Sequence, residues 1–240
     1  MKKLLSALAL VAGFANGAIA QDQKKETIEG NGKMETRTLP VQSFDALKVS
    51  GVFELKISQG SNESVKIEAD ENLQQNFTVH NEGSKLVIDM EKMKDKSMNL
   101  RSKNKMIVYV TFKKLKNLEL NMVGNTSSAN ELIFDDIDIT TKAVGNINLK
   151  LTADKITLKN KGVGNVTLSG KAQTADIISS GVGSLEAGDL IVQTMIIEKS
   201  GIGSADVNVT KNITVKSRGM GSIKNRGAAP LPRKKKVVEI

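Results

Sequence analysis

The chain has 240 residues and a formal net charge of +9, with 39% hydrophobic and 25% charged residues, which suits one or two globular domains. It contains no cysteine, which excludes disulfide bonds, a thiol nucleophile and a lipid-modified amino-terminal cysteine. Only 3% of its residues are aromatic, with no tryptophan and one tyrosine. Because stacking aromatics and a recognition motif are both missing, we expect no nucleic-acid partner.

Residues 1–20 have the pattern of a secretory signal peptide. Lys2 and Lys3 precede an apolar run from Leu4 to Phe14, and the small residues of Ala18-Ile19-Ala20 suit a cleavage site. The sequence therefore predicts an exported protein (periplasm, outer surface or extracellular), with the signal peptide cleaved after Ala20. The apolar run is shorter than the roughly 20 residues that span a bilayer. No other segment approaches that length, so we expect no transmembrane segment in the mature chain.

The segment that follows predicts an irregular amino-terminal β layer. Residues 21–40 are polar, and we expect a loosely ordered lead-in to the domain. From Leu47 to Ile57 apolar and polar residues alternate, as in a strand with one buried face. The charged residues 91–105 predict a mobile loop. Further apolar runs predict a hairpin and a last strand of the layer: 77–80, 85–90 and 106–112. We expect this layer to cover the open end of the repeat that comes next.

A repeat of about 19 residues occupies the second half of the chain. Each copy has an aliphatic residue, then a glycine, then asparagine or serine. The glycines are Gly124, Gly145, Gly164, Gly183, Gly203 and Gly221, followed by Asn125, Asn146, Asn165, Ser184, Ser204 and Ser222. Counted from each glycine, the residue six positions earlier is always aliphatic, and the residue four positions earlier is mostly polar. Stacked repeats keep the chemical type of a residue at fixed offsets in this way.

The repeat predicts an all-β solenoid. The unit is too short for a strand–helix–strand crossover, but it fits two or three short strands joined by tight turns. Equivalent strands then stack in parallel about 4.8 Å apart, so that six coils span roughly 30 Å. The glycines permit a positive φ at the corner, and the asparagine and serine side chains after them form a ladder along the structure. The alternative is six unrelated glycine-rich turns of an antiparallel sandwich.

Four basic clusters account for much of the positive charge. They are Lys92-Lys94-Lys96, Arg101-Lys103-Lys105, Lys113-Lys114-Lys116 and Arg233-Lys234-Lys235-Lys236. They could attract an anionic surface such as an acidic glycan. For the first three clusters we favour a solvated face whose lysines protect strand edges. Residues 227–240, which contain two prolines before the last cluster, predict a basic tail or partial cap.

Few residues could carry catalytic chemistry. His80 is the only histidine, so a histidine-based metal site or a Ser-His-Asp triad has no second histidine, and we interpret it as a surface residue. Asp135 and Asp136 are the closest acidic pair near the coils, but adjacent strand residues point to opposite faces, and we interpret them as a solvated turn. The even repeat also leaves no room for the long loops of a polysaccharide-cleaving β-helix. We expect no enzyme activity, no cofactor and no metal.

The chain resembles the family of putative auto-transporter adhesins with a head GIN domain, which are secreted bacterial proteins. The resemblance rests on Phe44–Leu55, the Gln59-Gly60 turn, Val65–Leu73 and the recurrent glycine–aliphatic–glycine steps. It implies a right-handed parallel β-helix over residues 41–226, and no catalytic or ligand residues to carry over.

These observations predict a non-catalytic, adhesin-like surface or periplasmic binding module with unknown ligand-binding residues. Its expected partner is an anionic glycan or other cell-surface material. The alternative is a structural envelope protein that self-assembles into homo-oligomers through its solenoid, and a polysaccharide-active enzyme is the less favoured third possibility.

Overall fold

The computed structural model describes residues 26–90 and 98–232. The predicted signal peptide and the basic clusters at 92–96 and 233–236 therefore lie outside the described residues. The strands form a two-stranded sheet of β1 and β8 and a fifteen-stranded sheet of all the others. The strands of the amino-terminal part are β1 (Glu26–Glu29), β2 (Met34–Leu39), β3 (Ala46–Val52), β4 (Glu54–Gln59), β5 (Ser64–Asp70), β6 (Phe77–Glu82), β7 (Lys85–Met90), β8 (Met98–Arg101) and β9 (Ile107–Phe112). One short 3₁₀ helix, η1 (Glu71–Asn76), follows β5.

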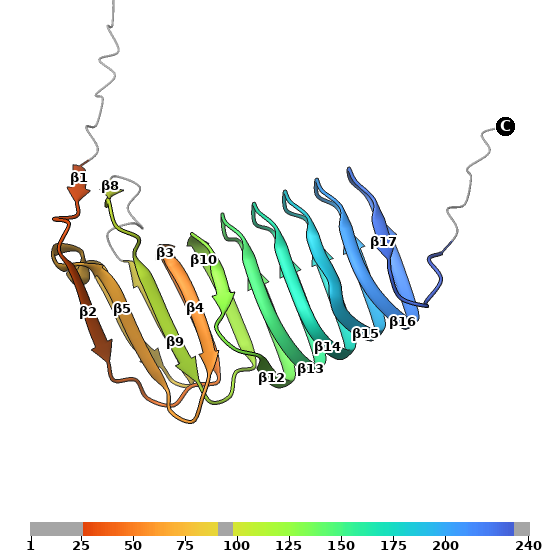
Figure 1. Cartoon of the computed structure of the whole chain (residues 1–240), viewed down its shortest axis with the longest axis horizontal. Coiled ribbons are helices and arrows are strands. Elements are labelled where there is room, and N and C mark those ends of the chain that lie inside the picture. Colours follow the sequence, from red (N-terminus) through yellow and green to blue (C-terminus); the bar gives the residue numbers. More distant parts are fainter. Residues whose placement is uncertain (1–25, 91–97, 233–240) are drawn as a thin grey trace, which may run out of the picture.

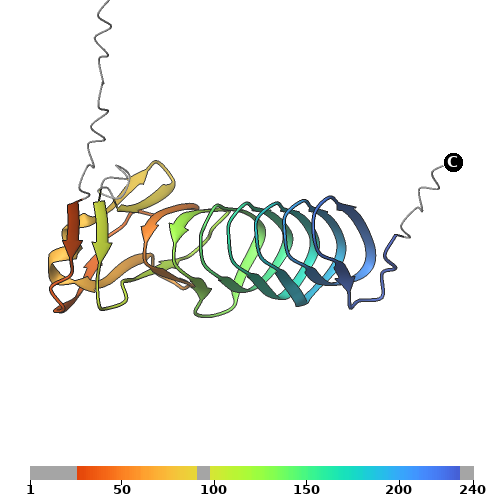
Figure 2. The ribbon, with the colours of Figure 1, turned by 90° about the horizontal axis from the view of Figure 1, so that it is seen from above.

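The remaining strands build the coils. They are β10 (Asn117–Val123), β11 (Thr126–Ser128), β12 (Leu132–Thr141), β13 (Ile147–Asn160), β14 (Val166–Ser179), β15 (Leu185–Lys199), β16 (Ala205–Ser217) and β17 (Ile223–Asn225). From β13 onward a coil is one long strand that bends halfway, followed by a short corner at the repeated glycine. Figure 1 shows the long strands side by side, with the thin corners along their upper edge, and Figure 2 shows the coils from above.

Stacking in register produces the predicted interior columns. The residues six positions before the glycines are Cα partners from coil to coil: Leu118, Ile139, Leu158, Ile177, Ile197 and Val215. All are buried except Val215, which is half-buried in the last coil. The prediction of a right-handed parallel β-helix is confirmed, with about five turns and coils about 20 residues apart.

A second interior column is polar, four positions before the glycines. Thr141, Asn160, Ser179 and Lys199 are buried despite their polarity. Three of these side chains bind the corner from inside. Thr141 Oγ1 accepts from the backbone N–H of Ala143, Asn160 Oδ1 accepts from the backbone N–H of Gly162, and Lys199 Nζ donates to the carbonyl oxygens of Gly201 and Met220 at 3.2 and 3.0 Å. A corner leaves backbone groups without strand partners, so these side chains replace the missing hydrogen bonds.

The amino-terminal part covers the end of the solenoid where the repeat begins, as predicted. β3 and β4 form a coil that stacks directly on the next, because β3 pairs in parallel with β10 and β4 with β11. On its other side lie β7 and β9, which pair in parallel with β3 and β4. Antiparallel strands close the end: β6 pairs with β7, β5 with β9, and β2 with β5.

Two expectations for this part are wrong. The described part of the lead-in segment contains two paired strands, because β1 pairs with β8 and β2 pairs with β5. Residues 91–97 of the predicted mobile loop lie outside the described residues. The rest of it contains β8, and Ser102 and Asn104 both donate hydrogen bonds to the buried carboxylate of Asp70. In each case the ordering partner is distant in the chain, so the local composition gives no sign of it.

Candidate functional site

The predicted corner glycines lie in one column along the solenoid. All six have a backbone φ between 113° and 141°, a region that residues other than glycine rarely adopt. The column is also too tight for a side chain. A Cβ atom on Gly183 would lie 2.1 Å from the carbonyl oxygen of Gly164 in the preceding coil. These glycines therefore have a structural role, since each permits both the bend and the close stacking.

The asparagines and serines after the glycines form hydrogen bonds between coils. The side-chain oxygens of Asn125, Asn146 and Asn165 each accept from the backbone N–H of the equivalent residue in the next coil, at 2.9 to 3.0 Å. Ser184 and Ser204 make the same contact at 3.4 Å. The donor of the last contact is the N–H of Ser222. Each of these side-chain oxygens is hydrogen-bonded to a backbone N–H of the next coil. The residues therefore stabilise the stacking of the coils, and their conspicuous spacing does not indicate a ligand site.

The aliphatic residues immediately before the glycines point outward. We name this column the aliphatic ridge: Val123, Val144, Val163, Val182, Ile202 and Met220, which are 47–67% exposed. Five single bridges connect these residues from one coil to the next, from Val123 to Met220. The sequence interpretation overlooked this exposure. The alternation of side chains along a strand could have revealed it. The residues six and four positions before the glycine point inward, and the residue one position before it, an odd number of positions away, therefore points outward.

A cleft of about 580 Å³ lies where the amino-terminal part meets the first coils. It combines two groups of residues that the sequence singled out separately. One wall is the basic cluster of Lys113, Lys114 and Lys116, and the other is the bend of β12, with Asp135, Asp136 and Asp138. The exposed side chain of Ile133 adds an apolar surface. We name this site the Lys–Asp cleft.

Gln59 holds the walls of the cleft in place. Its amide nitrogen donates to the carbonyl oxygens of Lys113 and Ile133, both at 3.0 Å, and its amide oxygen accepts from the backbone N–H of Ile133 at 2.6 Å. Asn130 also exchanges two hydrogen bonds with the Gln59 backbone. The side chain of Gln59 therefore connects the end of β4 to the segments that carry the lysines and the aspartates.

Two of the three lysines have partners outside the cleft. Lys113 pairs with Glu63 at 3.6 Å and Lys116 with Asp45 at 3.3 Å. Hydrogen bonds from Ser84 and then from Lys116 lower the pKa of the Asp45 carboxyl below its usual value. Within the described part of the chain, Lys114 has no ion-pair partner. Its ammonium is therefore the cation most accessible to a ligand.

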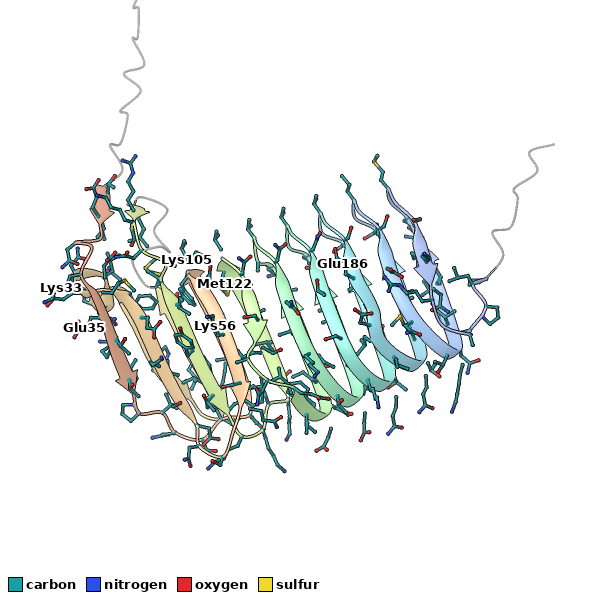
Figure 3. The ribbon with its side chains drawn as sticks, viewed as in Figure 1. Lys33, Glu35, Lys56, Lys105, Met122 and Glu186 are labelled. Atoms are coloured by element: carbon teal, nitrogen blue, oxygen red, sulfur yellow. The ribbon has the colours of Figure 1, made fainter. Side chains whose placement is uncertain are left out.

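A flat polar face runs along one side of the molecule. Across its strands the Cα register forms one row: Lys66, Tyr109, Lys56, Ser127, Asn148, Thr167, Glu186, Asp206 and Lys224. Figure 3 labels Lys56 and Glu186 in this row, at the amino-terminal part and among the coils. Every side chain in the row is polar or charged, so the face suits an extended polar contact.

Tyr109, the only tyrosine, is enclosed by charges on this face. Lys66 Nζ lies 4.1 Å from the ring centroid and Lys56 Nζ lies 5.4 Å from it. The hydroxyl donates to Glu68 at 2.8 Å, and hydrogen bonds from Lys66 and then Tyr109 lower the pKa of the Glu68 carboxyl. The same bond to Glu68 raises the pKa of the Tyr109 hydroxyl. Because the lysine covers the ring, the cluster stabilises the face instead of offering an open aromatic platform.

Residues considered for catalysis are not assembled into a catalytic site. His80 lies in β6 and is exposed, with only Glu82 at 3.3 Å. The interpretation of Asp135 and Asp136 as a turn is wrong, because both lie within β12. Both are exposed because the strand bends there, and Asp135 has no Cα partner in the pairing of β12 with β13. In the described ranges no group of three or more histidine, cysteine or acidic residues could hold a metal ion. No helix there is long and apolar enough to cross a membrane.

The fold is that of a parallel β-helix protein. The chain belongs to the family "Putative auto-transporter adhesin, head GIN domain", which it matches over residues 43–229. Membership of an adhesin family indicates a surface or exported protein. No curated protein matches the chain.

Solved structures agree with this assignment. The chain is similar to a putative adhesin from Bacteroides fragilis NCTC 9343, with 27% identity, a TM-score of 0.75, and coverage of 82% of this chain and 99% of that one. It is also similar to a putative lipid binding protein from Parabacteroides distasonis ATCC 8503, with 20% identity, a TM-score of 0.53, and coverage of 85% and 98%. A putative adhesin from Parabacteroides merdae ATCC 43184 has 20% identity, a TM-score of 0.50, and coverage of 85% and 98%. The last two likenesses concern the fold alone.

Proposed function

We propose that the protein is an exported, non-catalytic, adhesin-like binding module that holds a glycan in the Lys–Asp cleft. The observation that carries the proposal is the convergence of three lysines, three aspartates and Ile133 on one concave site. Adhesin family membership supports a binding role, and the sequence pattern supports export through a signal peptide cleaved after Ala20.

The composition of the cleft suits sugar hydroxyls. Carboxylates accept hydrogen bonds from neighbouring hydroxyls, ammonium groups donate to them, and an apolar side chain covers the C–H face of a sugar ring. The lining lysines and aspartates balance in charge. This balance supports a glycan with at most a local acidic substituent, placed at Lys114, over a uniformly anionic polymer.

The placement of the aspartates supports binding without hydrolysis. Glycoside hydrolysis needs two carboxyl groups on either side of the scissile bond. Asp135, Asp136 and Asp138 all come from one strand and form one wall, and the facing wall carries lysines. A bound sugar would therefore meet acids on one side only.

A glycan array probed with the mature protein tests this function, followed by titration of the best glycan. We expect Lys114→Ala and Asp136→Asn each to weaken binding by about tenfold, since each removes a charge-assisted hydrogen bond. Lys171→Ala is the matched control, because Lys171 is exposed on β14 outside the cleft. Absence of glycan binding, or equal affinity of both cleft variants and the wild type, would refute the proposal. Release of reducing ends from the bound glycan would refute its non-catalytic part.

Self-assembly is a second candidate function, favoured by one observation. Among the described residues, the part of β16 from Asn212 to Ser217 pairs with β15 only, because β17 pairs with just the first residues of β16. An unpaired edge can accept a strand from another copy. Light scattering should then show mass that grows with concentration, and Thr214→Pro should abolish the growth. A constant monomer mass would exclude this alternative.

A further inference from the structure

The packing of the coils does not explain why the exposed residues of the aliphatic ridge are all apolar. Another outward column of the same strands, five positions before the glycines, mixes charged, polar and apolar residues: Glu119, Thr140, Lys159, Ile178, Glu198 and Lys216. The ridge is aliphatic in every coil, although its residues vary in size from valine to methionine and are about half exposed. Such a persistent exposed apolar column indicates contact with an apolar phase or partner.

The shape of the ridge is convex. It follows the corners of the coils, which form the upper edge in Figure 1. In the last four coils each ridge residue stands between two glycines, as Val163 does between Gly162 and Gly164. Its two neighbours in the chain therefore have no side chains, so the ridge side chains protrude from the corner. At about 4.8 Å per coil, Val123 and Met220 are roughly 24 Å apart along the ridge.

A cationic margin borders the ridge. Three positions before the glycines stand Asn121, Lys142, Lys161, Ser180, Ser200 and Arg218, a column with three positive charges and no acid. Lys142, Lys161 and Arg218 are exposed and have no ion-pair partner among the described residues. On the other side, the asparagines and serines of the corner are neutral. At the amino-terminal end of the ridge, Asp89 is buried in a cleft of about 500 Å³ that Met122 also lines. Glu119 accepts a hydrogen bond from the side chain of Asn121 at 2.7 Å. Met122 is labelled in Figure 3.

We propose that the aliphatic ridge docks the protein on an anionic lipid surface, with the solenoid axis parallel to the bilayer. The apolar side chains would enter the headgroup boundary while the flanking cations meet lipid phosphates, which are the two contributions that hold peripheral proteins on membranes. A second copy of the chain fits the ridge less well. Two convex edges touch along a line, and their cationic margins would repel each other, whereas stable dimers bury roughly 800 Å² per partner.

This docking would leave the Lys–Asp cleft free. The cleft lies at the bend of β12, halfway round the coil from the glycine corners. A molecule lying on its ridge therefore turns the cleft away from the lipid. The membrane proposal does not depend on the glycan proposal, and each is measured separately.

Flotation of the full mature chain with lipid vesicles tests the inference, using vesicles of phosphatidylcholine alone and of phosphatidylcholine mixed with phosphatidylglycerol. We expect binding to the anionic vesicles that weakens with salt. Val163→Asp should lower the partition coefficient by about tenfold or more, because it places a carboxylate in the ridge. Lys161→Ala should lower it about fivefold on anionic vesicles only.

The control for the carboxylate is Ile191→Asp. Ile191 is 45% exposed against 49% for Val163, and it lies next to the bend of β15, away from the ridge. Its substitution should leave the partition coefficient within about twofold of wild type, since only the net charge changes. Val163→Ser provides an uncharged second variant, and thermal melts confirm that all variants fold.

Three results would overturn the inference. The first is wild-type protein that stays with neither type of vesicle. The second is an equal loss for Val163→Asp and Ile191→Asp, which would reduce the effect to net charge. The third is a wild-type oligomer that Val163→Asp converts to a monomer, which would show that a second copy occupies the ridge.

Discussion

The coils and the amino-terminal part both contain stacked parallel strands, but they differ in how far apart the paired strands lie in the chain. From β12 onward each strand pairs with the strand that follows it in the chain, as β13 does with β14 and β14 with β15. In the amino-terminal part β3 pairs with β7 and β10, both of which come much later. The geometry of a parallel stack is therefore independent of how the chain reaches it, and only local stacking leaves a visible period in the sequence.

The two parts also differ in how they are stabilised. The coils repeat a small set of contacts, with an interior column, a glycine corner and an inter-coil hydrogen bond. The amino-terminal part depends on single long-range contacts, such as those of Gln59 and Asp70. Changes in the coils should thus act through stacking, and changes in the amino-terminal part through individual contacts.

The largest effect is expected in the interior of a coil. Val166 is 2% exposed, so Val166→Asp would bury an unpaired carboxylate, which costs several kcal/mol and is comparable with the stability of a domain. We expect this variant not to fold. Thr167→Asp, one residue later on the outward face, should change the free energy of unfolding by less than about 1 kcal/mol. Thermal melts followed by circular dichroism measure both. Similar melting of the two variants would contradict the inward and outward assignment.

The corner column gives the next largest effect, and a glycine of the amino-terminal part serves as its control. Gly183→Ala combines backbone strain with overlap on Gly164, so we expect a loss of about 2–5 kcal/mol in the free energy of unfolding. Gly83, in the hairpin between β6 and β7, also has a positive φ, at 61°, but has open space around it. Gly83→Ala should cost only about 1 kcal/mol. Urea titrations compare the two, and equal losses would show that stacking adds nothing at the corner.

The smallest effect concerns a single carboxylate, Asp70. Hydrogen bonds from Ser102, then Asn104 and the backbone of Gly32, lower its pKa below the ordinary 3.8 despite its burial. A lowered folded-state pKa means that Asp70 contributes stability above the ordinary pKa, and this contribution is lost as the pH falls through the folded-state pKa. Asp70→Asn should lose about 1–3 kcal/mol at neutral pH and flatten the decline in acid.

Tyr109 makes this last measurement local. It lies in β9 and is the only tyrosine in a chain without tryptophan, so its fluorescence reports on the amino-terminal part alone. In acid we expect the Tyr109 signal to change before the circular dichroism of the coils does. Asp138→Asn, at an exposed position on β12, should leave both signals at their wild-type pH. Simultaneous loss of both signals in the wild type would show that the two parts unfold as one unit.

The sequence predicted the coils well because stacking repeats each residue's surroundings. Leu158, Ile177 and Ile197 share a column, so their shared character was visible at a fixed spacing. The polar column of Thr141 and Asn160 was visible too, but hydrogen bonding to the corner explains its burial, and polarity alone does not reveal that.

The candidate sites were harder to predict because they depend on contacts between distant segments. The two walls of the Lys–Asp cleft were each noticed, but their approach depends on Gln59, whose contacts a linear pattern cannot show. The order of β7, β3 and β10 in space was hidden for the same reason, since alternation identifies a strand but not its neighbour.

The position of β3 and β4 has a consequence for how the molecule assembles. They precede both of their neighbouring layers in the chain, yet they end between β7 and β9 on one side and β10 and β11 on the other. A chain that emerges amino-terminus first must therefore keep two unpaired strand edges from sticking to other molecules until more than half of its length has arrived. Helper proteins that shield extended segments during translocation would act on this stretch above all.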